Sequence, residues 1–318
     1  MTVSRSLSLA LILVCLLSAG SAAADVNDSE WLSMSAGEIT VRHRTEDTQA
    51  AERILSVARE SSVEIAREMG LDAFGPVTIT IAATGEDFER ETAGGAPDWG
   101  VGVASPRRGS VVIRSPRTVR YPLQMEQVVV HELAHVAVGR VLRGVWVPRW
   151  FHEGIAMAVA GEWRLGASQE VAAALAGGHL ISLRDLRSSF PAGGRAAMLA
   201  YTESFYAVEL IKRRSNASNS GELVRAIAEE GSFESALVEL TGGDADDLEE
   251  ALAAFVERRL GWSHLLLDGR VMFAGLAGLV LIAVVVRLRR SRKKMTEWAE
   301  AERAGREPGE TTRWDWKH

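Results

Sequence analysis

The sequence predicts an α+β protein with a small β-sheet, a mainly helical part and a separate apolar helix near the C-terminus. Segments 77–82 and 109–114 are rich in β-branched residues, which favours strands. From Pro122 onward the apolar residues recur with helical spacing. Residues 271–286 are apolar without a charge, which sets the last helix apart from the rest.

Length and composition limit the kind of protein. A chain of 318 residues is long enough for one large or two modest domains with a hydrophobic core. Its net charge of −6 includes no basic excess of the kind that nucleic-acid binding needs, so DNA and RNA are not expected as partners. The single cysteine, Cys15, lies in a segment that we expect to be removed, which excludes a disulfide framework and cysteine-ligated metal.

Residues 1–24 have the three-part layout of a secretory signal peptide. Arg5 provides positive charge, residues 7–17 are apolar apart from one serine, and small residues up to Ala24 fit the A-x-A cleavage rule. The apolar run is shorter than the roughly 20 residues of a bilayer span, which favours a cleaved signal over an uncleaved anchor. We therefore expect a domain over residues 25–262 that lies outside the cytoplasm.

The elements of this domain follow in order. Residues 39–42 alternate as a short strand, and residues 47–70 carry apolar side chains at helical spacing, with a glycine as stop signal. Glycine and proline residues in 94–106 predict a loop between the two strands named above. Two apolar helices follow, one over 122–142 and one over 150–161.

The apolar run near the C-terminus predicts a transmembrane helix over residues 266–288. Its charge-free part is about 24 Å long at roughly 1.5 Å per residue, slightly less than a hydrocarbon core of about 30 Å. Six of the eight residues in 287–294 are basic, as at the cytoplasmic end of a span. We therefore expect a single-pass protein of the cell membrane with residues 289–318 as a cytoplasmic tail. A buried core helix is the alternative.

The motif His131-Glu-Leu-Ala-His135 lies within the predicted helix 122–142. Two histidines four apart on a helix lie one turn above each other, so both imidazoles can reach one metal ion. Glu132 projects from an adjacent face, close enough to take a proton from water at that ion. Because the helix is apolar nearly all round and hence buried, these polar groups need partners, which a metal would supply. Hydrogen-bonded core histidines are the alternative.

A catalytic zinc site needs a third protein ligand besides the two histidines. A helical hairpin would bring the second apolar helix, 150–161, back alongside the first. His152 and Glu153 are both candidates, but neighbours in a helix point about 100° apart, so only one of them is expected to face the metal. Helical periodicity does not choose between them.

The two helices resemble those of the gluzincin metallopeptidases, particularly the bacterial peptidase MA-like families. The first block matches H-E-L-x-H, and after a gap of 12 residues Pro148 to Ala156 match P-x-W-x-x-E-G-x-A. Residues 200–204 are similar to the A-Y-x-x-S segment of these families, and the likeness extends over roughly residues 75–260.

The resemblance implies a thermolysin-like domain that holds Zn²⁺. Its ligands would be His131, His135 and Glu153, and Glu132 would act as general base. Tyr201 is the candidate that stabilises the oxyanion of the transition state, with a packed helix tyrosine as the alternative.

One position departs from the pattern of these families. Thermolysin-like members often carry an aspartate four residues after the ligand glutamate, where it supports a zinc histidine, but here that residue is Met157. The supporting carboxylate must therefore come from elsewhere in the chain. We interpret Arg149, Glu162 and Glu203 as solvated or ion-paired surface residues. Residues 111–114 are either an ordinary strand or the edge along which a peptide pairs.

These expectations define a membrane-anchored, extracytoplasmic zinc peptidase that hydrolyses peptide or protein substrates through an activated water. One rival is an inactive pseudo-peptidase that serves as a binding scaffold, although a non-catalytic zinc site has no need of Glu132. The other rival is a structural zinc site with four protein ligands, of which His152 would be the fourth.

Overall fold

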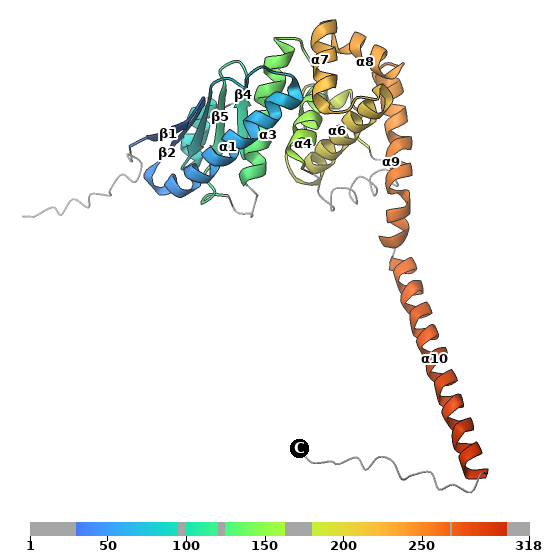
Figure 1. Ribbon diagram of the computed structural model, residues 1–318. Helices are drawn as coiled ribbons and strands as arrows, with labels where there is room; N and C mark the ends of the chain where they lie inside the picture. Colours follow the sequence, from blue (N-terminus) through green and yellow to red (C-terminus); the bar gives the residue numbers. More distant parts are fainter. Residues whose placement is uncertain (1–29, 95–99, 120–124, 163–179, 268, 304–318) are drawn as a thin grey trace, which may run out of the picture.

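The computed structural model describes a sheet with its covering helices, a helical group beside them and a long helix that extends away from both (Figure 1). The signal peptide predicted for residues 1–24 lies outside the described residues, as does the end of the predicted tail. The described residues are 30–94, 100–119, 125–162, 180–267 and 269–303.

A mixed sheet of five strands forms the N-terminal part, in the order β1-β2-β3-β5-β4. Strands β2, β3 and β5 run parallel, whereas β1 is antiparallel to β2 and β4 is antiparallel to β5. The edges of this sheet are therefore β1 and β4. The bounds are β1 (Leu32–Ala36), β2 (Ile39–His43), β3 (Val77–Ala82), β4 (Gly102–Ser105) and β5 (Ser110–Arg114).

The structure confirms the three predicted strands as β2, β3 and β5 and adds two that the sequence pattern did not predict. β4 lies inside segment 94–106, which predicted only a loop. It forms because the chain folds back on β5, so that Gly102 pairs with Ile113 and Ser105 with Ser110. The alternative in which residues 111–114 form an edge strand is wrong, since β5 lies between β3 and β4.

Helices cover both faces of the sheet. On one face α1 (Thr48–Met69) packs against α3 (Met125–Leu142), and both contact strands. The other face carries α2 (Gly85–Thr92), whose Phe88 is fully buried over β3 and β5. Helix α1 follows the short 3-10 helix η1 (Thr45–Asp47) and ends at Gly70, which has the left-handed φ of 70° that the predicted stop signal requires.

The second part of the domain is helical and packs against α3. α4 contacts both α3 and α6, so the expected pairing of the two apolar helices is present. Ring contacts among Trp150, Phe151 and Phe233 at centroid distances of 5.2–5.9 Å fix α4 against α8. The elements are α4 (Arg149–Ala160), η2 (Asp185–Arg187), α6 (Gly194–Ser215), α7 (Ser220–Glu230), α8 (Phe233–Thr241) and α9 (Ala245–Leu267).

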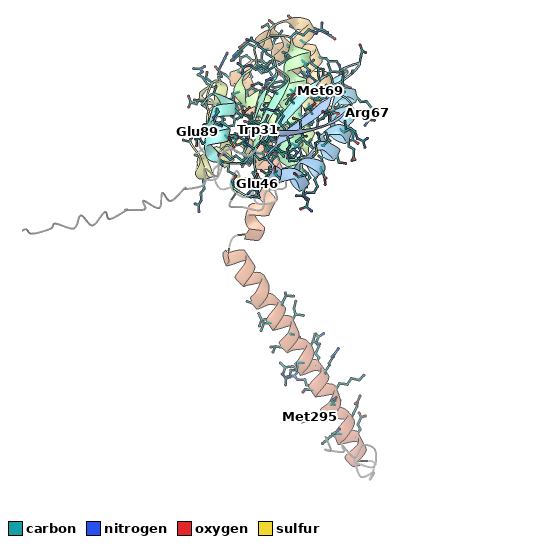
Figure 2. The ribbon with its side chains drawn as sticks, turned by 90° about the vertical axis from the view of Figure 1, so that its left-hand side faces the viewer. Trp31, Glu46, Arg67, Met69, Glu89 and Met295 are labelled. Carbon is teal, nitrogen blue, oxygen red and sulfur yellow. The ribbon has the colours of Figure 1, made fainter. Side chains whose placement is uncertain are left out.

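Helix α10 (Gly269–Arg303) follows α9 and leads away from the sheet and its helices (Figure 1). Met295 lies on its distant half, far from the labelled residues of the domain (Figure 2). Among the residues that the structure describes, none of the helices is both long and apolar enough to cross a membrane. The structure therefore does not confirm the transmembrane helix predicted over residues 266–288.

Glu203 on α6 is buried, which corrects its interpretation as a surface residue. Its exposed fraction is 0%, and its two carboxylate oxygens accept the backbone N–H of Ile181 at 3.1 and 3.2 Å. Glu249 on α9 accepts the backbone N–H of Leu183 at 2.8 Å. Both carboxylates thus hold the segment before η2. Burial raises the pKa of Glu203 to about 8. The hydrogen bond from the N–H of Ile181 lowers this pKa, and the negative charge of Glu249 raises it further.

The raised pKa of Glu203 predicts that the fold loses stability as the pH rises toward 8. In the unfolded chain this carboxyl has its ordinary pKa of 4.5, so between pH 4.5 and about 8 only the folded state keeps the proton. The stabilising contribution is complete below pH 4.5, is lost through pH 8 and amounts to on the order of a few kcal/mol. The free energy of unfolding, measured with urea across this pH range, should depend less on pH in Glu203→Gln than in the parent. The control Glu209→Gln, also on α6, should behave as the parent, and an unchanged slope in E203Q would contradict the prediction.

Candidate metal centre

Helix α3 places the two histidines of the site. His131 and His135 are one turn apart, and their rings meet edge to face with centroids 4.7 Å apart. Valine, leucine and alanine side chains around them are fully buried, so the helix is fixed against the sheet and α4. The side chains of both histidines are only 13% exposed, and the histidines therefore face the interior of the domain, not bulk water.

Helix α4 brings Glu153 to the two histidines. Nε2 of His131 and Nε2 of His135 lie 3.1 Å apart, and Oε2 of Glu153 lies 3.5 and 3.4 Å from them. A tetrahedral zinc ion with bonds of about 2.0–2.1 Å has ligand atoms roughly 3.3–3.4 Å from one another. The three atoms therefore have the separation that one zinc ion needs, and two imidazoles with a carboxylate form a donor set that suits zinc.

The charges within this group depend on one another. Burial works against ionisation of Glu153, but the two histidines outweigh it and hold the pKa of Glu153 well below its ordinary value. Burial likewise opposes a charge on His131, but Glu153 and Glu162 outweigh it and raise the pKa of His131 well above its ordinary value. A cation at this position would meet a carboxylate that is already ionised.

Glu132 is buried next to strand β4. It is 6% exposed, and a Cβ atom at Gly102 would lie only 2.5 Å from its Oε1. The absence of a side chain at Gly102 thus makes room for the carboxylate. Burial raises the pKa of Glu132, against the opposing charges of His135 and His131, and this favours a carboxylate that accepts a proton readily.

His152 faces His135 and not the group of three ligand atoms. The Nδ1 atoms of these histidines lie 2.6 Å apart, with their ring planes at 24°. Nδ1 and Nε2 of His135 point in different directions from the ring, and Nε2 is the atom that faces Glu153. Burial, followed by the charge of His135, lowers the pKa of His152 to about 3, so that His152 is neutral at physiological pH.

Tyr201 lies on α6, close enough to Glu153 for the charge of that carboxylate to act on its pKa. Its ring contacts Phe190 with centroids 5.0 Å apart, and the guanidinium carbon of Arg149 lies 5.1 Å from the Phe190 ring. Nε of Arg149 is 3.4 Å from Oε1 of Glu153. Burial and the charge of Glu153 raise the pKa of Tyr201, so its phenol stays protonated and can donate a hydrogen bond.

Glu162 belongs to this site, although the sequence pattern did not predict it there. Its Oε1 lies 3.3 Å from Nδ1 of His131, and its side chain is 19% exposed. It is ion-paired, as expected, but with a histidine of the metal group and not with a surface residue. Spacing along the chain gave no signal for it, because Glu162 lies beyond the end of α4 at Gly161.

Two histidines on one helix and a glutamate on the next, in an α+β domain, form a group that could hold a metal ion. The chain belongs to the Peptidase MA superfamily, whose sequence profile matches residues 57–258. The resemblance drawn from the two motifs is thereby confirmed.

The solved structures that match this chain share low sequence identity and low TM-scores with it. Native yeast LTA4 hydrolase shares 13% identity with a TM-score of 0.43, covering 71% of this chain and 38% of that chain. An aminopeptidase N family protein from Idiomarina loihiensis shares 13% identity with a TM-score of 0.38, covering 66% of this chain and 42% of that chain. An M1 zinc metallopeptidase mutant from Deinococcus radiodurans, bound to a Tyr-Ser-Ala substrate, shares 16% identity with a TM-score of 0.35. The match covers 71% of this chain and 51% of that chain. The chain thus spans about half or less of their length, and no curated protein matches it.

Proposed function

We propose that the protein is a zinc-dependent peptidase that hydrolyses peptide bonds. The observation that carries the proposal is the set of three ligand atoms 3.1–3.5 Å apart, with Glu132 buried beside them. Membership of the Peptidase MA superfamily supports it. When bound, a zinc ion supplies a Lewis acid for amide hydrolysis at neutral pH.

We assign the following roles to the residues of the site. His131, His135 and Glu153 hold the metal. Glu132 takes a proton from the attacking water and later delivers it to the leaving amine, and its burial suits that exchange. Tyr201, protonated and beside Glu153, donates a hydrogen bond to the oxyanion that develops on the scissile carbonyl.

The substrate would be an extended segment of a peptide or protein. β4 has β5 on one side and no strand on the other among the described residues, so its free backbone groups can pair with a peptide. Because Gly102 at the start of β4 lies against Glu132, a peptide on this edge would pass the general base.

Location at a membrane is a further part of the proposal. It is supported by the apolar run 271–286, by the basic residues after it and by exposed apolar side chains on α10, among them Leu279, Leu281 and Ile282. The catalytic domain would then lie outside the cytoplasm and the tail inside. Cell fractionation tests this point: the full chain should stay with membranes in an alkaline wash, and release by that wash would contradict anchoring.

Metal content and peptide cleavage of the purified full chain test the proposed activity. We expect about one zinc per chain, as in a mononuclear catalytic site. A peptide library should be cleaved by the metal-loaded protein, not after chelation, and again after zinc is restored. Zinc without cleavage of any peptide or protein would favour the binding scaffold, and absence of zinc would contradict the metal site itself.

The alternative of a structural zinc site fits the geometry less well. A closed site needs a fourth protein ligand, and His152 was the candidate. Nδ1 of His152 lies instead 2.6 Å from Nδ1 of His135, whereas Nε2 of His135 faces Glu153. Among the described residues the group has three ligand atoms, so we propose that the fourth position takes water or substrate.

A further inference from the structure

We propose that Glu162 and His152 are positioning residues that orient the two zinc histidines, with Glu162 acting on His131 and His152 on His135. This inference rests on the proposed function, since it assigns partners to ligands of the proposed metal. Neither residue belongs to the group of three candidate metal ligands. Each acts through an imidazole whose Nδ1 it faces.

The tautomer of each histidine explains why such partners are needed. Nε2 of both rings points to the shared group, so Nε2 must lack a proton when it binds a metal. The remaining proton of each neutral ring is then on Nδ1, where it needs an acceptor. A partner at Nδ1 fixes the tautomer and the ring rotation and makes Nε2 a better ligand.

Glu162 is held at His131 by the end of helix α4. Gly161 adopts a left-handed conformation with φ 62°, and the backbone N–H of Glu162 donates to the carbonyl of Met157 at 3.1 Å. This helix-ending motif turns the chain so that the carboxylate reaches the ring, with Oε1 3.3 Å from Nδ1 of His131. The Nδ1 atom is buried and makes no hydrogen bond in the structure, and the carboxylate of Glu162 at 3.3 Å is an acceptor that a small rotation of either side chain would bring to it.

His152 is held at His135 by helix α4 itself. It precedes the proposed ligand Glu153, so the two side chains point about 100° apart around the helix axis. Glu153 thereby meets Nε2 of His135 while His152 meets Nδ1 of the same ring. One of two Nδ1 atoms at 2.6 Å must accept, and with the proton on His135 this is His152.

Zinc affinity of the full chain tests the proposal, measured by equilibrium competition with a chelator. We expect Glu162→Ala and His152→Phe each to weaken zinc binding by about 10- to 100-fold, the usual effect of losing such a partner. Glu162→Gln keeps an acceptor oxygen without the charge and should fall between the parent and E162A. Glu230→Gln, an exposed glutamate at the end of α7, is the control and should bind as the parent does.

A second readout separates positioning from general stability. In the zinc-loaded parent, nitrogen-proton NMR of the histidines should show Nδ1 protonated in both ligand rings. Loss or shift of the His131 signal in E162A alone, and of the His135 signal in H152F alone, is expected, with unchanged circular dichroism. Zinc affinities and spectra equal to those of the parent would overturn the proposal while leaving the peptidase intact. A parent that binds no zinc would overturn the proposed metal site, and this inference with it.

Discussion

Replacement of Glu132 by glutamine should abolish peptide cleavage while zinc remains bound. Glutamine has nearly the same shape, so it fits the space that Gly102 leaves beside β4, but it cannot take a proton from water. Loss of a general base costs about 10²- to 10⁴-fold in rate. Glu132 is not one of the three candidate ligands, which are His131, His135 and Glu153. The zinc content of the variant should therefore stay at the level of the parent.

The measurement pairs kcat/KM on a cleaved peptide with zinc content by elemental analysis. Glu126→Gln, an exposed glutamate in the first turn of the same helix, is the matched control and should retain both activity and zinc. If E132Q kept full activity, Glu132 would not be the base. If it lost zinc as well, its role would be to hold the metal or the fold.

The first half of the site follows from local periodicity and could be predicted. His131 and His135 share a helix, so their spacing fixes their relative positions without knowledge of the rest of the chain. The long apolar helices and the strands β2, β3 and β5 were found for the same reason, since each repeats its pattern over several residues.

The second half of the site depends on how the helices meet, which local pattern does not encode. His152 and Glu153 were equal candidates by periodicity, and only the position of α4 against α3 turns Glu153 to the metal group and His152 to Nδ1 of His135. Glu162 is brought to His131 by a turn beyond the helix. β4 is short and begins with a glycine, so its strand character comes from pairing with β5 alone.

Gly154→Ala should destabilise the fold and weaken zinc binding together. A Cβ atom at this position would lie 2.4 Å from the carbonyl oxygen of Ser204 and 2.7 Å from Cγ2 of Val208, both on α6. The backbone oxygen cannot move away without shifting the helix, so α4 and α6 must separate. Such overpacking costs about 1–3 kcal/mol. Glu153 is the adjacent residue, so displacement of α4 also moves a proposed zinc ligand.

The control for this prediction is Gly278→Ala in α10, where a Cβ atom would meet nothing within 4 Å. Alanine stabilises a helix by about 1 kcal/mol over glycine, so G278A should be neutral or slightly stabilising. Thermal unfolding of the zinc-free chain and zinc competition measure the two effects in each variant. G154A with the Tm of the parent would show that α4 and α6 can separate at no cost. A lower Tm with unchanged zinc affinity would mean that the packing of α4 on α6 stabilises the domain without setting the position of Glu153.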